Sequence, residues 1–264
     1  MNKFIFCCSA ELGSYVFSAS WDEDLIVSYE IEDYLFDRTN WVFKKNKGTL
    51  NKEISKIFID YINKASIKTI EENIEKNRNN PELQGYCTDN PSYKVMYMTG
   101  DWFDTAFWDS GDFASQLEQY KYLYFAMMLC DENVINFIRW EHEGDNIGIP
   151  FEGKVRDLYF SDDNNEIIYF PNNIKQAEDK DVLAYYEEIK VKIADCFRKG
   201  FKIPENSSDS DYWDVVLIND NDEIFYYTGC KNDNPCLDRV AESINDDKLD
   251  VLTNPKQVDI VKKP

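Results

Sequence analysis

Residues 211–229, with the sequence DYWDVVLINDNDEIFYYTG, decide the fold of this chain. Two runs rich in β-branched and aromatic residues, 213–218 and 223–227, flank the polar residues 219–222. Such runs on either side of a short Asn/Asp turn are typical of a β-hairpin, so we predict one here. A weaker version of the pattern at residues 93–108 predicts a second hairpin, with its turn around Gly100.

The rest of the chain alternates between hairpin patterns and helical patterns. In residues 50–77, apolar residues such as Ile54, Ile57 and Phe58 recur at helical spacing. The lysine-rich stretch that follows Trp41 is interpreted as a loop. In chain order we predict a strand at 3–8, a hairpin at 15–31, a helix at 50–77, a hairpin at 93–108, a helix at 113–130, a hairpin at 155–170, a helix at 175–199, the hairpin at 211–229 and a helix at 236–244.

This order predicts an α+β fold with two similar hairpin–helix–hairpin–helix subdomains, whose antiparallel or mixed sheets carry helices on one side. We place the first subdomain at residues 1–132, a connector at 133–153 and the second subdomain at 154–264. Internal duplication and the generic patterning of α+β proteins both explain the repeated order. The sequence leaves both explanations open, because the halves share no recognisable residue identity.

The composition indicates what kind of partner the protein binds. The formal net charge is −21, from 50 acidic and 29 basic side chains. A field of this sign repels nucleic acids and anionic membranes and attracts basic proteins. We therefore expect a basic protein partner, with no direct nucleic-acid or membrane contact, and leave the oligomeric state open. Solubility alone is the competing explanation of the acidity.

The cysteines follow no ligand pattern. The chain has 7 of them, an odd number, and no CxxC motif occurs. Since thiols are normally reduced in the cytoplasm, we expect free thiols in a cytoplasmic protein, with no cofactor and no metal. The apolar residues near the N-terminus are interpreted as a first strand rather than a signal peptide.

Residues 212–244 resemble a module of small proteins from low-GC Gram-positive bacteria. In that module a strand beginning with Trp meets an acidic turn with a Gly, a second strand ending in Tyr-Ser/Thr-Gly, and then a helix. The matching residues here are Trp213, Val215, Leu217, the turn 220–223, Tyr227, Thr228 and Gly229. The turn departs from the module, because Asn221-Asp222-Glu223 stands where its Gly is expected. The resemblance implies a hairpin followed by a helix and implies no activity.

Two stretches lack lysine and arginine but are rich in acids and aromatics. Residues 95–120 contain five acids and residues 203–230 contain seven. Because successive strand residues face opposite ways, aromatic side chains can pack inward while carboxylates line the outer face. We predict that these stretches bind the partner through Asp101, Trp102, Asp104, Trp108, Asp109, Asp112, Asp209, Asp211, Asp214, Asp220, Asp222, Glu223 and Tyr226.

No catalytic motif is present, so we expect no catalytic residues. The single histidine, His142, lies between Glu141 and Glu143, and a lone histidine supplies no metal-binding pair. The acids of residues 220–223 lack the EF-hand spacing, so we interpret them as a turn.

Together these observations favour a non-enzymatic binding protein that blocks a basic nuclease or another nucleic-acid-binding protein. Such a role suits toxin immunity or phage anti-defence, with nucleic-acid mimicry as one form of it. Two alternatives stay open: a metal- or carboxylate-dependent hydrolase with a site between the halves, and a structural subunit of a larger assembly.

Overall fold

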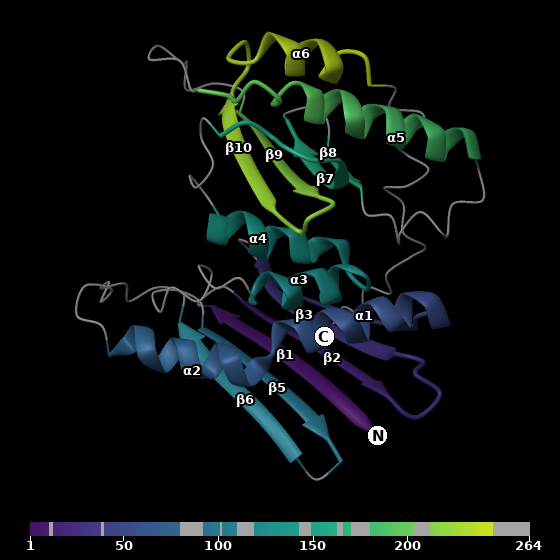
Figure 1. Cartoon of the computed structure of the whole chain (residues 1–264), viewed down its shortest axis with the longest axis vertical. Coiled ribbons are helices and arrows are strands. Elements are labelled where there is room, and N and C mark those ends of the chain that lie inside the picture. The colour runs from purple at the N-terminus through teal and green to yellow at the C-terminus, as the bar shows by residue number, and fades with distance from the viewer. Residues whose placement is uncertain are drawn as a thin grey trace. The chain divides into compact units, whose positions relative to one another are not determined.

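The computed structural model describes residues 1–10, 13–37, 40–79, 92–100, 102–109, 119–142, 149–162, 166–169, 180–202 and 212–244. The chain divides into two compact units, the first ending at Val134 and the second beginning at Ile135 (Figure 1). Each unit combines an antiparallel sheet with helices, so the predicted α+β class is confirmed. No helix within the described ranges is both long enough and apolar enough to cross a membrane.

The first unit is built on a six-stranded sheet whose strand pairs are all antiparallel. The strand order is β4-β3-β2-β1-β5-β6, so β4 and β6 are its two edges. The predicted pairing within residues 15–31 is confirmed, and Leu25 N donates to Asp22 O across the acidic turn at 3.2 Å. The strands are β1 Asn2–Ala10, β2 Gly13–Trp21, β3 Ser28–Asp37, β4 Asn40–Thr49, β5 Ser92–Thr99 and β6 Trp102–Asp109.

The prediction of a loop after Trp41 is wrong, because this stretch forms strand β4. Lys45 makes ion pairs with Glu30 and Glu32 of the neighbouring strand β3, the latter at 2.7 Å. Such cross-strand pairs of opposite charge favour strand pairing. Lysines are also typical of edge strands, where their charge discourages pairing with other chains. The lysine cluster is therefore the sign of an edge strand rather than of a loop.

Two helices replace the single helix predicted at residues 50–77. Helix α1 spans Lys52–Ala65 and α2 spans Ile67–Arg78. Ser66 separates them with a φ of 46°, in the left-handed region that ends many helices. The described part of the helix predicted at 113–130 is α3, Lys121–Met128, and the short 3-10 helix η4, Glu132–Val134, follows it.

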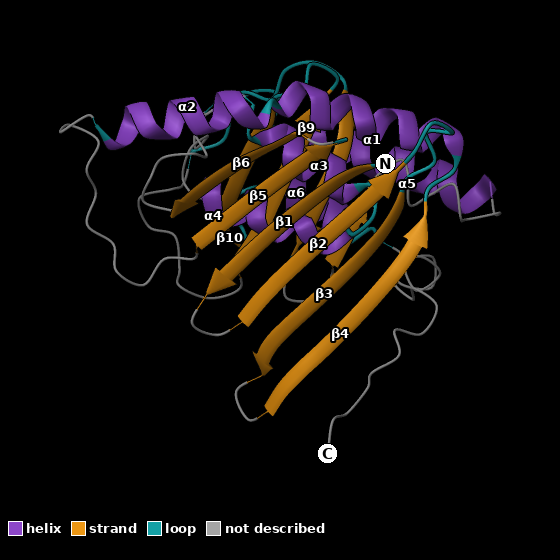
Figure 2. Ribbon diagram, turned by 90° about the horizontal axis from the view of Figure 1, so that it is seen from below, coloured by secondary structure: helices purple, strands orange, loops and turns teal. Residues whose placement is uncertain are grey.

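The helices of the first unit cover one face of its sheet, and Figure 2 looks onto the other face. The Phe58 ring of α1 lies about 6 Å, between centroids, from the rings of Phe4 and Phe17. Tyr124 of α3 makes a similar edge-on contact with Phe6. Side chains on the opposite face, at the alternate strand positions, are half-buried or exposed. We call this second face the open face.

The second unit is built on a four-stranded antiparallel sheet in the order β10-β9-β7-β8. Both hairpins predicted in this part of the chain are confirmed. The strands are β7 Val155–Ser161, β8 Glu166–Tyr169, β9 Tyr212–Asn219 and β10 Ile224–Cys230. Two helices of this unit, besides α4 Ile135–His142, are α5 Lys180–Asp195 and α6 Pro235–Ala241.

The two sheets share a four-strand arrangement. In the first unit, hairpin β5–β6 pairs through β5 with β1, which gives the order β2-β1-β5-β6. In the second unit, hairpin β9–β10 pairs through β9 with β7, which gives β8-β7-β9-β10. The first unit adds hairpin β3–β4 beyond β2. The units are thus alike in topology and unequal in size, and internal duplication stays a prediction.

The segment predicted as a connector, 133–153, contains ordered structure of the second unit. Helix α4 spans Ile135–His142, and Ile138 on it is fully buried. Phe151 is buried too, and its N–H donates to Phe197 O at 3.0 Å. The described residues of this segment from 135 onward therefore belong to a folded unit rather than to a linker.

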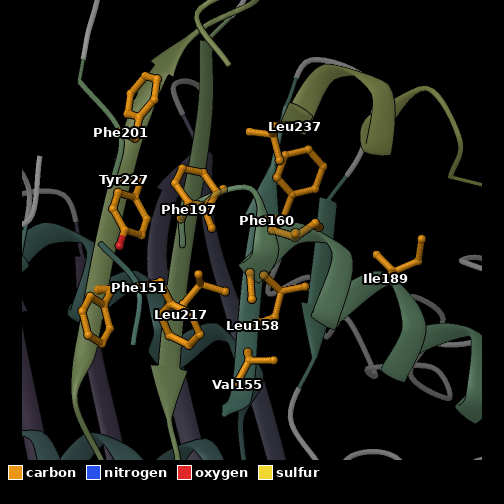
Figure 3. Packing of buried hydrophobic residues seen from close by; sticks show 14 of the residues in the cluster. Phe151, Val155, Leu158, Phe160, Ile189, Phe197, Phe201, Leu217, Tyr227 and Leu237 are labelled. Carbon is orange, nitrogen blue, oxygen red and sulfur yellow. The ribbon is translucent and has the colours of Figure 1, made fainter. Parts of the chain in front are cut away.

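Aromatic rings fill the core between the second sheet and the C-terminal part of α5 (Figure 3). Tyr227 stacks on Phe197 with ring centroids 4.2 Å apart, and its hydroxyl donates to Ile149 O at 2.8 Å. Trp213 is buried in the same cluster, and its Nε1 donates to Cys230 O at 2.8 Å. The polar tips of both rings are thus satisfied, as buried Tyr and Trp require.

Gly229, at the end of the Tyr-Thr-Gly run, has a packing role. It lies opposite Trp213 in the β9–β10 register. A Cβ at Gly229 would lie 2.9 Å from Trp213 Cε2 and closer still to Cζ2. Because the indole is buried and hydrogen-bonded, it has little room to move. This close approach explains why the residue opposite Trp213 is a glycine, which has no Cβ.

Gly229→Ala is expected to lower the free energy of unfolding by about 1–3 kcal/mol, the usual cost of an overpacked core. Thermal unfolding followed by circular dichroism measures it. Gly48→Ala in β4 is the control, since its methyl would meet the outer, hydroxyl end of the half-buried Tyr29 ring. A larger loss of stability for Gly48→Ala than for Gly229→Ala would contradict this account.

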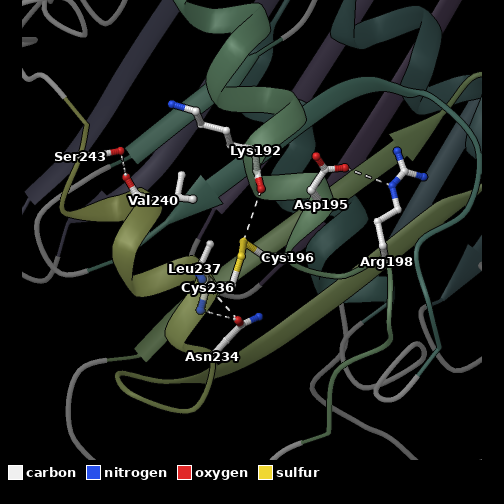
Figure 4. The surroundings of a disulfide bond; sticks show 9 residues. All are labelled: Lys192, Asp195, Cys196, Arg198, Asn234, Cys236, Leu237, Val240 and Ser243. Atoms are coloured by element: carbon white, nitrogen blue, oxygen red, sulfur yellow. Dashed lines mark hydrogen bonds and ion pairs between the residues drawn. A yellow bond between two sulfur atoms is a disulfide. The ribbon is translucent and has the colours of Figure 1, made fainter.

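One pair of cysteines contradicts the expectation of free thiols. Cys196 and Cys236 form a disulfide that joins the end of α5 to the first turn of α6 (Figure 4). Their Cα atoms are 5.4 Å apart although 40 positions separate them in sequence. The approach of the two helices creates the pair, so cysteine spacing carried no sign of it. Among the described cysteines, Cys7 and Cys130 are free thiols.

Reduction of the Cys196–Cys236 disulfide is expected to lower the stability of the second unit by about 2–4 kcal/mol, because it releases a closed loop in the unfolded chain. Urea unfolding with and without dithiothreitol measures the difference. The Cys196→Ser/Cys236→Ser variant is the control and should be insensitive to dithiothreitol. An equal response of the variant and the natural chain to reductant would show that the effect arises elsewhere.

Candidate binding surface

Hairpin β9–β10 is buried on both faces. Val215 and Leu217 belong to the core with α5, and Val216 and Ile218 on the other face are at most 1% exposed. Two of the predicted contact residues lie here as a pair: the buried Tyr226 hydroxyl donates to Asp214 Oδ1 at 2.6 Å. This hairpin therefore lacks the outward row of carboxylates that the sequence predicted.

The turn between β9 and β10 is organised by a buried asparagine. Asn219 Oδ1 accepts hydrogen bonds from Asn221 N at 2.9 Å and Glu223 N at 3.0 Å. Its Nδ2 donates to Glu152 O at 3.1 Å and to Glu223 Oε2 at 2.6 Å. Glu223, a predicted contact residue, is thus held within the turn.

The other two acids of this turn bind the segment before β7. Asp220 Oδ1 accepts from Lys154 N at 3.0 Å, and Asp220 N donates to Lys154 O at 2.9 Å. Asp222 forms an ion pair with Arg156, whose Nε donates to Asp157 Oδ2 at 2.7 Å. Desolvation raises the pKa of the buried Asp157, and the Arg156 charge opposes that shift. These contacts give the turn acids a structural role. The remaining predicted acids of this stretch, Asp209 and Asp211, lie outside the described residues.

Strand β6, in the other predicted stretch, is an edge strand that exposes large aromatic side chains. Within the described residues it pairs with β5 alone. Trp102 is 83% exposed, Phe103 66% and Phe107 51%, and Asp104 between them is exposed too. Clustered apolar exposure of this kind marks interaction sites on soluble proteins. This strand is therefore the candidate binding surface.

The two faces of β6 differ in chemistry. Ala106 is buried on the face that the helices cover. Trp102 and Asp104 are an even number of residues away from it, so they lie on the helix side. Phe103 and Phe107 lie on the open face. A partner that runs along this edge meets a carboxylate on one side and phenylalanine rings on the other.

On the open face, apolar side chains of β5 and β1 continue the surface. Met98 lies opposite Phe103, and Met96 lies opposite Ile5. Lys94 lies opposite Phe107, and Lys3 opposite Met98, so two lysines border the apolar residues. We call the apolar group the apolar strip; it comprises Ile5, Met96, Met98, Phe103 and Phe107.

On the helix side, α2 packs against β6 and adds charge. Among the α2 side chains whose exposure the structure describes, the exposed acids together with Asp104 outnumber the exposed bases; the side chain of Arg78, at the end of the helix, is outside that set. These α2 residues are Glu71, Glu72 and Glu75 against Lys68 and Lys76. Of the other predicted contact residues, Trp108 and Asp109 lie in β6 opposite Tyr93 and Ser92, whereas Asp101 and Asp112 lie outside the described residues.

The two edges of the six-stranded sheet carry opposite chemistry. Edge β4 exposes Lys44, Lys45 and Lys47. Natural sheets protect an edge in this way, because lysine opposes pairing with another strand. Edge β6 has no lysine or arginine and exposes Trp102 and Phe103 instead. The lysines of edge β4 thus oppose pairing with another strand, whereas edge β6 carries no such charge and is suited to pairing.

The described residues show no arrangement that indicates metal chemistry. No group of three or more His, Cys, Asp or Glu side chains among them could hold a metal ion. Two of the free thiols lack the character of nucleophiles, since burial raises the pKa of the Cys7 thiol and raises that of Cys130 well above its usual value. Catalytic cysteines have lowered pKa values instead. His142 is the last residue of α4.

One group of titratable side chains lies where β2 and β3 approach the segment after α3. Tyr15 donates its hydroxyl to Asp131 Oδ2 at 2.9 Å. Burial raises the pKa of Tyr15 well above its usual value, with Asp131 adding to the shift, and burial also raises the pKa of Asp33. Tyr15 therefore stays protonated at neutral pH and serves as a hydrogen-bond donor within the core.

Comparison with known proteins adds no relative. No family model matches this chain, and no curated protein matches it. The resemblance of residues 212–244 to a bacterial module stays a prediction.

Phe103 and Phe107 are exposed aromatic residues of β6 that the sequence prediction did not name. The strand reads WFDTAFWD, with aromatics at both even and odd positions. Since a strand alternates its faces, aromatics at both parities cannot all point into one core. This pattern could have indicated from the sequence that some of these rings are exposed. The edge position of β6, which leaves them exposed, depends on the strand order of the sheet.

Proposed function

We propose that this protein is a non-enzymatic inhibitor that binds a basic protein, a nuclease or another nucleic-acid-binding protein, through the β6 edge. The observation that carries the proposal is the exposure of Trp102, Phe103 and Phe107 on an edge strand of an acidic protein. Aromatic anchors supply most of the affinity in such interfaces, and opposite charge speeds association and selects partners. Toxin immunity and anti-defence are the biological settings that suit this activity.

Charge complementarity, rather than nucleic-acid mimicry, is the form of recognition that we propose. Mimicry of a phosphate backbone requires a regular row of carboxylates. In β6 the acids Asp104 and Asp109 are five positions apart in sequence, whereas a row along one face of a strand needs acids at every second position. In β9 and β10, Asp214 is the single acid, and it accepts the Tyr226 hydrogen bond. Neither hairpin supplies such a row.

We propose that the protein acts in the cytoplasm, where nucleic-acid-binding targets work. In that reducing compartment the Cys196–Cys236 pair would be held as thiols. Helix α6 would then depend on the buried Leu237 and on Asn234, whose Oδ1 accepts from Leu237 N at 3.2 Å. The β6 edge belongs to the other unit and does not include this pair.

An inhibition screen tests the proposal. Purified basic nucleases, chosen to cover both DNases and RNases, are assayed with and without an excess of the protein at 50 and 300 mM salt. We expect inhibition of at least one nuclease, with weaker binding at the higher salt because the attraction is screened. Basic proteins of similar charge that are not nucleases, such as lysozyme, control for simple charge attraction.

Two results would contradict the proposal: no basic nuclease is bound or inhibited, or the affinity does not change with salt. Light scattering of the free protein covers the alternative of a structural subunit, which predicts a defined homo-oligomer. Turnover of generic phosphoester or glycoside substrates by the protein itself would favour the hydrolase alternative instead.

A further inference from the structure

We infer that the partner binds β6 by strand addition, as an extended segment that alternates basic and apolar residues and becomes a seventh strand of the first sheet. This inference rests on the proposed function, because it specifies how the basic partner is recognised. Strand addition to an exposed sheet edge is a common mode of peptide recognition, in which main-chain hydrogen bonds give affinity and alternate side chains give specificity.

The position and length of β6 fit this mode. It has eight residues, Trp102–Asp109, all paired in unbroken register with β5. An edge strand presents N–H and C=O groups that point away from the sheet, and another strand can pair with them. At edge β4 the exposed Lys44, Lys45 and Lys47 oppose such pairing, particularly for a basic segment.

The two sides of β6 specify the alternation in the added strand. Side chains that point to the open face would meet Phe103 and the apolar strip, so they must be apolar. The lysines that border this strip, Lys3 and Lys94, would repel a basic residue there. Successive strand residues point to opposite faces, so the neighbouring side chains must point to the helix side.

On the helix side a basic residue finds favourable charge. Asp104 is exposed there, and among the described side chains of α2 the exposed acids are Glu71, Glu72 and Glu75 and the exposed bases are Lys68 and Lys76. Trp102, the most exposed of the three aromatic side chains, lies on the same side of β6 as Asp104. Its indole face can hold a lysine or arginine by a cation–π contact while the carboxylate pairs with the charge.

Synthetic peptides test the inference with the full-length chain. The parent peptide is a nine-residue segment of alternating lysine and valine. Two derivatives carry N-methyl groups on every second residue, one at the lysines and the other at the valines. In a strand, the two sets of N–H groups point to opposite edges, so each derivative blocks one edge and leaves side chains intact.

We expect the parent peptide to bind, one methylated derivative to bind equally well, and the other to lose at least tenfold in affinity by isothermal titration calorimetry. The inference is overturned if both derivatives keep the parent affinity, since docking would then need no main-chain pairing, or if both lose it. A scrambled peptide of the same composition, with lysines and valines in blocks, should bind at least tenfold more weakly.

Failure of this inference is distinguishable from failure of the proposed function. A basic nuclease that is inhibited while the parent peptide shows no binding at 1 mM would overturn strand addition and leave the proposed function standing. Absence of any basic partner would remove the proposed function itself. A homodimer that Phe103→Ser dissociates would overturn the inference in another way, because a second copy would then occupy β6.

Discussion

The Trp102→Ser/Phe103→Ser double variant is expected to bind its basic partner about 100-fold more weakly than the natural chain. Both side chains lie at the exposed edge, and aromatic anchors of this kind each contribute on the order of 2 kcal/mol when an interface buries them. Because the two losses are not strictly additive, we expect a combined loss of about 2.7 kcal/mol in binding free energy, which corresponds to a 100-fold weaker affinity. Titration of the partner by calorimetry or by inhibition measures the change.

The control for this variant removes exposed apolar surface elsewhere in the same unit. Tyr34 on β3 and Ile57 on α1 are 40% and 39% exposed, and their double replacement by serine should change the affinity less than threefold. The melting temperatures of both double variants should stay close to that of the natural chain, because exposed substitutions cost little stability. Equal loss of binding in both would contradict a specific role for β6.

Asn219→Ala is expected to lower the free energy of unfolding of the second unit by about 3 kcal/mol. The side chain is fully buried and makes four hydrogen bonds, three within the β9–β10 turn and one to Glu152 O before β7. Its removal leaves donors and acceptors without partners, and each unsatisfied group costs about 1–3 kcal/mol where water cannot replace the bond. Amide hydrogen exchange of β9 reports the stability of this unit separately from the first.

Two variants of the same turn sharpen the Asn219 prediction. Asn221→Ala changes an exposed side chain, so it should lower the free energy of unfolding by less than about 0.5 kcal/mol, as most surface substitutions do. Asn219→Asp keeps the acceptors but loses the donors to Glu152 O and Glu223, and it places two carboxylates together, so it should be as harmful as Asn219→Ala. Similar small effects for all three would show that the turn does not depend on Asn219.

Much of the fold could be predicted from local pattern. Hairpin β9–β10 and helix α5 carry strong signals, because their apolar residues follow the periods of strand and helix. Strand β4 was missed because its lysines make sense only beside Glu30 and Glu32 of the neighbouring strand. The break at Ser66 was missed because the apolar spacing continues from α1 into α2 without interruption.

The binding surface was harder to predict, because exposure depends on the strand order. Both candidate stretches combine acidic and aromatic residues, so the sequence alone does not distinguish the exposed stretch from the buried one. In the sheets, β6 is an outer strand with exposed rings, whereas β9 lies between β7 and β10 and is buried on both faces. The acids after Asn219 look available in sequence, but Asp220 and Asp222 bind Lys154 and Arg156.

The central claim is that β6, rather than the β9–β10 hairpin, is the binding surface, and a hydrogen-exchange footprint tests it most directly. Amide exchange of the whole chain is compared with and without the inhibited nuclease. We predict strong protection of residues 102–109, with no change in β4 or in the turn at 219–223. Protection centred on 219–223 or on β4, with β6 unchanged, would contradict the account.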